Sequence, residues 1–75
     1  MKKIIHLSTI NDVKFFVNTV SRYDFDVDLI SGRYAVDAKS IMGIFSLDLT
    51  KPITMEIHDD NCAEFLEEIK GFISD

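Results

Sequence analysis

The sequence predicts an α+β fold in which a four-stranded antiparallel sheet carries its helices on one face. Segments with a period of two residues alternate with segments of helical period, in the order β-α-β-β-α-β-α. The chain has 75 residues, of which 47% are hydrophobic, and this is enough for one core in a single domain over residues 1–75. One cysteine, Cys62, excludes an internal disulfide, so packing alone must hold the fold.

The first two elements are a strand and a helix. Residues 3–8 are short and rich in apolar and β-branched side chains, which favours a strand. Thr9 and Asp12 have the spacing of a capping box and precede the helix. We therefore expect Thr9 to be its N-cap. Apolar residues then recur at helical spacing and form one face of the helix (Val13, Phe16, Val17, Val20, Tyr23).

Two strands joined by a tight turn are predicted next. Acids alternate with apolar residues over residues 24–30, which predicts a strand with one face in water. The acids would lie on that open face (Asp24, Asp26, Asp28). They resemble the start of a calcium loop, but the glycine and closing glutamate of such a loop are missing. Ser31-Gly32 forms the turn, and residues 33–37 return as a strand.

The second half adds a short helix, a strand and a final helix. Residues 41–45 could form a strand, but Ser40 before them is a good N-cap and favours a short helix. Residues 53–57 alternate and predict the fourth strand. Asn61 and Glu64 have capping-box spacing, so we expect them to begin the last helix. Its apolar stripe is long (Cys62, Phe65, Leu66, Ile69, Phe72, Ile73).

Charge and hydropathy exclude several function classes. Thirteen acids and eight basic residues give a net charge of −5, which argues against a nucleic-acid partner. No apolar stretch approaches the roughly 20 residues that span a bilayer, and no cleavage site follows the apolar start of the chain. We therefore expect a cytoplasmic protein with protein partners and no membrane contact.

The reactive side chains form no recognisable catalytic or metal-binding pattern. His6 lies in a predicted strand without the arginine or glycine neighbours of an anion site, so we interpret it as an exposed or hydrogen-bonded strand residue. His58 precedes two acids, Asp59 and Asp60, which is typical of a surface turn. Cys62 lies on an apolar stripe and is expected to be a buried, inert thiol. We predict no metal, no cofactor and no enzymatic activity.

Residues 39–47 carry the most specific pattern, Lys-Ser-Ile-Met-Gly-Ile-Phe-Ser-Leu. Here a hydroxyl at a helix N-cap stands beside a cation, Lys39. The four apolar residues that follow have more apolar surface than so short a helix can bury (Ile41, Met42, Ile44, Phe45). Exposed apolar side chains of this kind are typical of a partner surface. The alternative is that these four side chains only close the end of a small core.

This segment resembles the Lys-Ser-Ile-Met-Gly-Val/Leu-Met-Ser-Leu signature of the HPr family. These proteins are the histidine phosphocarriers of the bacterial phosphoenolpyruvate:sugar phosphotransferase system. Residues 16–24 and 26–29 are similar to the first helix and second strand of the Gram-positive members. The resemblance covers nearly the whole chain. It implies an open-faced β-sandwich with helices on one face of an antiparallel sheet, in agreement with the element order.

The chain departs from the family at the carrier histidine, which lies in a Gly-Leu/Ile-His-Ala-Arg-Pro block. Counting back from Ser40 without gaps places Thr9 at the histidine, Asn11 at the arginine and Asp12 at the proline. An anion site at a helix N-terminus needs free N–H groups and positive charge, and a Thr9–Asp12 capping box removes both. The resemblance therefore implies an HPr-like, Crh-like member that lacks the carrier histidine.

Ser40 aligns with the family's regulatory serine. The resemblance implies phosphorylation by an HPr kinase/phosphorylase and binding of the phosphoserine form to a transcription regulator in catabolite repression. The residues around it correspond to the docking surface (Lys39, Ile41, Met42, Phe45). Our hypothesis is a regulatory protein-binding module with Ser40 as its switch. The alternatives are a phosphocarrier that uses His6, and an HPr-derived interaction domain in which neither phosphosite is used.

Overall fold

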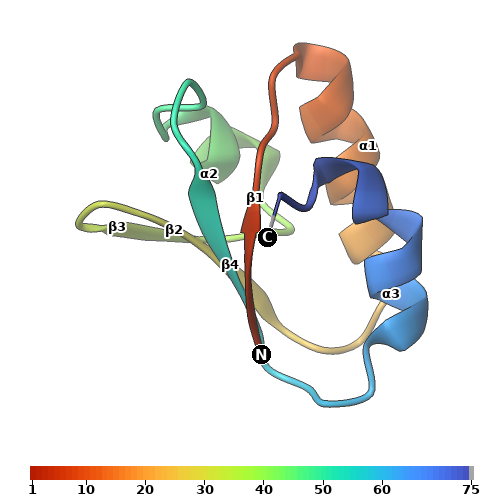
Figure 1. The fold of residues 1–75 in the computed structure, drawn as a ribbon. Helices are drawn as coiled ribbons and strands as arrows, with labels where there is room; N and C mark the ends of the chain where they lie inside the picture. Colours follow the sequence, from red (N-terminus) through yellow and green to blue (C-terminus); the bar gives the residue numbers. More distant parts are fainter. Residues whose placement is uncertain (75) are drawn as a thin grey trace.

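The computed structural model describes residues 1–74 and contains the expected four-stranded antiparallel sheet (Figure 1). The strands are β1 (Lys2–Ile5), β2 (Val27–Ser31), β3 (Tyr34–Asp37) and β4 (Ile53–Ile57). Their order across the sheet is β1-β4-β2-β3, so β4 and β2 are central and β1 and β3 lie at the edges. The predicted α+β fold class is confirmed.

Three helices and a short 3₁₀ turn complete the fold. They are α1 (Ile10–Val20), α2 (Ile41–Phe45), α3 (Ala63–Glu68) and η1 (Lys70–Phe72). Figure 1 shows α1 and α3 side by side on one face of the sheet, with α2 near the β3 edge. None of the helices within residues 1–74 has the length and apolar character needed to cross a bilayer.

The core fills the space between the sheet and the helices. Phe16 of α1 and Phe65 of α3 are fully buried, with ring centroids 6.3 Å apart. On the sheet, Leu29 of β2 is the cross-strand partner of Met55 of β4, and both side chains are fully buried. The apolar stripes that predicted these helices therefore face the core, but both α-helices are shorter than their stripes. Tyr23 lies beyond the end of α1, and three residues of the last stripe lie beyond the end of α3 (Ile69, Phe72, Ile73).

β1 and β2 are shorter than predicted because their partner β4 ends, and β3 begins one residue later than predicted, at Tyr34. β1 stops at Ile5, which pairs with Ile53 at the start of β4. The next position along β4 is Pro52, which has no N–H to donate, so the pairing ends and His6 lies beyond the strand. β2 begins at Val27, so of the three predicted open-face acids only Asp28 lies in a strand.

The predicted capping box of the last helix is wrong. α3 has Cys62 as its N-cap and no side-chain cap hydrogen bond. The N–H of Asn61 instead donates to Asp59 Oδ1 at 2.7 Å, which makes Asn61 part of an aspartate-centred turn. Cys62 is 2% exposed because its side chain packs into the core, as predicted for an inert thiol. Burial of one apolar side chain thus outweighed a local capping signal.

Candidate functional site

The start of α1 carries a complete capping box. Thr9 has an extended backbone (φ −125°, ψ 164°), and its Oγ1 accepts a hydrogen bond from the N–H of Asp12 at 3.0 Å. In return, Asp12 Oδ2 accepts from the N–H groups of Thr9 at 3.2 Å and Ser8 at 3.0 Å. The predicted N-cap role of Thr9 is confirmed. Three backbone donors at this helix start are therefore already bonded to side chains.

Charge at the same place is unfavourable for an anion. Asp12 puts a carboxylate in the first turn of α1, and the exposed Asn11 beside it is neutral. The exposed His6 follows β1, and its backbone N–H donates to the carbonyl of Phe72 at 2.9 Å. Within residues 1–74, the His6 imidazole makes no hydrogen bond or ion pair. A phosphoryl group near Thr9 would meet a negative charge and occupied donors.

Ser40 begins α2 as predicted. Its exposed side chain accepts a hydrogen bond from the N–H of Gly43 at 3.2 Å. A side chain at Gly43 would crowd this cap, since a Cβ there would lie 3.2 Å from both Ser40 Oγ and Val36 Cβ. Glycine in the middle of this helix therefore allows α2 to approach β3 closely while Ser40 keeps its cap.

The side chain of Lys39, which precedes Ser40 in the sequence, contacts Tyr23. Its Nζ donates to the backbone carbonyl of Tyr23 at 2.8 Å, and its backbone N–H donates to Asp37 Oδ1 at 2.8 Å. Lys39 thus holds the start of α2 against the chain that leaves α1. In this conformation its charge serves a structural contact with Tyr23 and is not directed at the Ser40 hydroxyl.

The four apolar side chains of α2 have different surroundings. Ile44 is fully buried and Ile41 packs partly against the core, as in the alternative interpretation. Met42 is 77% exposed and Phe45 is 41% exposed. The exposed apolar surface predicted for this segment is therefore carried mainly by Met42 and Phe45, on a helix whose start is Ser40.

Thr9 and the side chain of Lys39, the neighbour of Ser40, lie at different ends of α1. Thr9 is at its start, whereas Lys39, next to Ser40, bonds to Tyr23 just past its end. A helix of 11 residues is about 16 Å long, and this length separates Thr9 from the Lys39 ammonium. We describe them as two sites: a capped helix start and an exposed serine beside an apolar surface.

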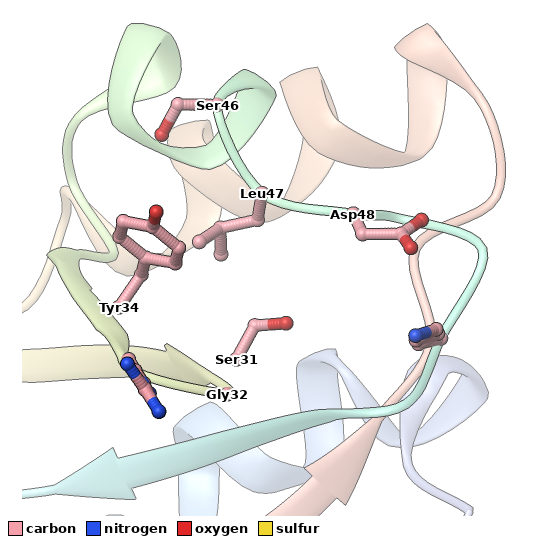
Figure 2. Close-up of a pocket in the computed structure, with 8 residues that line it drawn as sticks. Ser31, Gly32, Tyr34, Ser46, Leu47 and Asp48 are labelled. Atoms are coloured by element: carbon pink, nitrogen blue, oxygen red, sulfur yellow. The ribbon is translucent and has the colours of Figure 1, made fainter.

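A shallow pocket that the sequence did not indicate lies between the β2–β3 turn and the loop after α2 (Figure 2). The side chains of Tyr34, which is 72% exposed, and Leu47 point toward one another there. Charged residues also line the pocket (Arg33, Asp48, Lys51). Hydrogen bonds from the side chain and backbone of Thr50 hold the pKa of Asp48 below its usual value. The two walls come from separate parts of the chain, so no sequence spacing marks this pocket.

A second cluster missed by sequence analysis joins α1 to α3. Glu68 accepts hydrogen bonds from the Tyr23 hydroxyl and the Arg22 guanidinium. The hydrogen bond to Glu68, together with desolvation, raises the pKa of Tyr23 to about 12. The same two bonds lower the pKa of Glu68, the one from Tyr23 more strongly. Tyr23 and Glu68 are 45 positions apart, so no local pattern could have paired them.

Comparison with known proteins gives a consistent result. The model of the family described as "PTS HPr component phosphorylation site" matches residues 12–75, a range that begins three positions after Thr9. No curated protein matches the chain.

Three solved structures share the fold. HPr-C-His from Thermoanaerobacter tengcongensis has a TM-score of 0.78 and 22% identity, over 95% of this chain and 88% of that one. The phosphocarrier protein HPr from Bacillus anthracis str. Ames has a TM-score of 0.74 and 25% identity, over 99% and 96%. A histidine-containing phosphocarrier protein from a mycoplasma has 0.71 and 17%, over 95% and 86%.

Proposed function

The chain belongs to the HPr family of the phosphotransferase system, and from this premise we propose that it is a regulatory protein-binding module and not a phosphocarrier. The observation that carries the proposal is the capping box at the start of α1. Counting back from Ser40 without gaps places Thr9 at the family's carrier histidine. Asp12 accepts hydrogen bonds from the N–H groups of Ser8 and Thr9. A phosphoryl group there could not use these two N–H groups, and the Asp12 carboxylate would repel it.

The chemistry of threonine supports the same proposal. A phosphocarrier must accept and release its phosphoryl group reversibly, and the imidazole nitrogen of a histidine does so through a high-energy bond. A threonine hydroxyl forms a stable phosphate ester instead. Thr9 also uses its oxygen to accept the Asp12 N–H, so it acts as a cap.

Ser40 is the proposed switch. Its hydroxyl is exposed at the start of α2, two residues before the exposed Met42. Phosphorylation adds a charge of about −1.5 to −2 and three acceptor oxygens at this point. The new charge lies at the edge of the Met42–Phe45 surface, where it changes which partner surfaces are complementary. We propose an HPr kinase/phosphorylase as the modifying enzyme and a transcription regulator as the partner, with Lys39, Ile41, Met42 and Phe45 at the contact.

Two parallel reactions test this proposal. The protein is incubated with phosphoenolpyruvate and enzyme I in one tube, and with ATP and HPr kinase in another, and the intact mass is measured. We expect one stable phosphate in the second tube only. Ser40→Ala should abolish it, while Ser46→Ala, which changes an exposed serine at the other end of α2, should not.

The outcomes separate the alternatives. An acid-labile phosphate in the first tube would contradict the non-carrier proposal, and its loss in His6→Ala would identify His6 as the carrier. Absence of phosphate in both tubes would contradict the Ser40 switch. It would favour an interaction domain in which neither phosphosite is used.

A further inference from the structure

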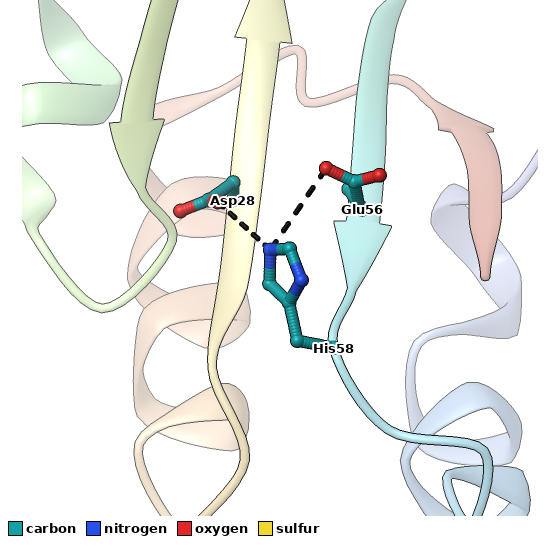
Figure 3. Close-up of side chains that lie close together, drawn as sticks. All are labelled: Asp28, Glu56 and His58. Atoms are coloured by element: carbon teal, nitrogen blue, oxygen red, sulfur yellow. Dashed lines mark hydrogen bonds and ion pairs between the residues drawn. The ribbon is translucent and has the colours of Figure 1, made fainter.

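Three side chains with metal-ligating atoms converge on the face of the sheet that the helices leave open (Figure 3). Asp28 of β2 and Glu56 of β4 are direct cross-strand partners, and His58 follows Glu56 by two residues and shares its face. His58 Nε2 lies 2.9 Å from Asp28 Oδ2 and 3.9 Å from Glu56 Oε1. One ligand atom from each residue lies within 4.8 Å of the other two.

These separations suit ligands that share one small cation. Zinc bonds to imidazole nitrogen and carboxylate oxygen are about 2.0–2.2 Å long, so neighbouring ligand atoms in a tetrahedral site are about 3.4 Å apart. The distances of 2.9 and 3.9 Å lie on either side of this value, each about 0.5 Å from it.

The backbone beneath the three side chains is held firmly. β2 and β4 are the two central strands, and Asp28 and Glu56 lie within their paired region. His58 lies just beyond β4, but its N–H donates to the carbonyl of Asp26 at 2.9 Å, so it remains attached to the chain entering β2. A site on such a scaffold loses little freedom when an ion binds.

The charges at this place favour a cation. Asp28 has Glu56 as its cross-strand partner on one side and Asp37 on the other, and like charges in directly opposed positions destabilise a sheet. Lys2 offsets part of this charge, with Nζ 3.8 Å from Glu56 Oε2. The side chains of Asp28, Glu56 and His58 are 43%, 31% and 45% exposed, so an ion can reach them from solvent.

We propose that Asp28, Glu56 and His58 bind a divalent transition-metal ion of the zinc type. Two carboxylates balance its charge, and the imidazole is a ligand that zinc accepts and that calcium and magnesium do not favour. Water fills the remaining coordination position. The bound ion cross-links β2 and β4 on the open face and therefore stabilises the folded chain. The proposal is independent of Ser40 phosphorylation.

Calorimetric titration of the untagged protein with zinc chloride tests the proposal, because an affinity tag rich in histidine would bind the metal itself. We expect one Zn²⁺ per chain, with magnesium and calcium binding much more weakly. His58→Ala should weaken zinc binding at least about tenfold. His6→Ala is the matched control, since it removes the chain's other exposed histidine and should leave binding unchanged.

Thermal unfolding provides a second readout. Zinc should raise the midpoint temperature of the wild-type protein and of His6→Ala by similar amounts, and that of His58→Ala or Asp28→Asn by clearly less. Equal zinc affinity of the wild type and His58→Ala would overturn the proposal. Equal affinity for zinc and calcium would also overturn it, because it would reveal only attraction to the acidic strands.

Discussion

At the start of α1, a hydroxyl and a carboxylate accept hydrogen bonds from three backbone donors, and the carboxylate adds a negative charge. Thr9 accepts from the N–H of Asp12, and Asp12 accepts from those of Ser8 and Thr9. Counting back from Ser40 without gaps, the resemblance places the family's histidine, arginine and proline at Thr9, Asn11 and Asp12. Under the proposed function, these substitutions replace a helix start that accepts a phosphoryl group with one that is capped by its own side chains.

The energetic role of Thr9 can be measured directly. Thr9→Ala removes the side-chain acceptor for the Asp12 N–H and should lower the free energy of unfolding by about 1 kcal/mol. Urea unfolding measures this change. Asn18→Ala is the control, because Asn18 is exposed in the middle of α1 and alanine favours helix there. Similar losses in both variants would show that Thr9 does not act as a cap.

At the scale of elements, side chains join helices that the sequence separates widely. Glu68 of α3 accepts hydrogen bonds from Tyr23 and Arg22, which follow the end of α1. Lys39, just before α2, donates a hydrogen bond to the carbonyl of Tyr23. The aromatic rings continue this contact, since Tyr23 stacks on Phe25 with centroids 5.2 Å apart. Tyr23 is therefore the residue at which α1, α2 and α3 are held together.

This junction predicts a pH dependence. The pKa of Tyr23 is raised to about 12, so the junction contributes stability that is complete below the usual tyrosine pKa of about 10. That stability should be lost as pH rises towards and through 12. Absorbance of ionised tyrosine measures the midpoint in a Tyr34→Phe background, where Tyr23 is the remaining tyrosine.

A matched pair of variants tests whether Glu68 causes the raised pKa of Tyr23. Glu68→Ala should lower the midpoint of Tyr23, because its hydrogen bond to Glu68 is the largest cause of the raised pKa. Glu67→Ala should leave the midpoint unchanged, since Glu67 pairs with Lys70 at 2.7 Å. An unchanged midpoint in Glu68→Ala would show that Glu68 does not hold the phenol proton.

At the scale of the whole molecule, several aromatic rings of the core meet at one residue, Phe65. Phe65 is fully buried and meets three aromatic rings, those of Phe16, Tyr23 and Phe25, at centroid distances of 6.3, 5.4 and 5.6 Å. Small domains bury a smaller fraction of their surface than large ones, so each core residue matters more. Phe65 connects α3 to α1 and to the chain that enters β2.

Removal of the Phe65 ring should therefore destabilise the folded protein strongly. Phe65→Ala should lower the free energy of unfolding by about 3–5 kcal/mol, a large part of the total for a small domain. Phe45→Ala removes the same ring from a position that is 41% exposed and should cost much less. Urea unfolding followed by circular dichroism compares the two. Equal losses would mean that Phe65 is not central to the core.

The order of helices and strands, the capping box at Thr9 and the cap at Ser40 could all be read from the sequence. Each depends on residues within a few positions of one another, and local hydrogen bonds and hydrophobic periodicity determine such features. The same local reasoning failed at Asn61. There, burial of the neighbouring Cys62 against the core decided which residue precedes α3.

Only the tertiary structure decided which α2 side chains are exposed and which distant residues meet. Met42 and Ile44 are both apolar and lie two positions apart, yet one faces solvent and the other is fully buried. His58 is 30 residues from Asp28 and reaches it because β2 and β4 are neighbours in the sheet. Such contacts depend on strand order and helix packing, which residue spacing along the chain does not encode.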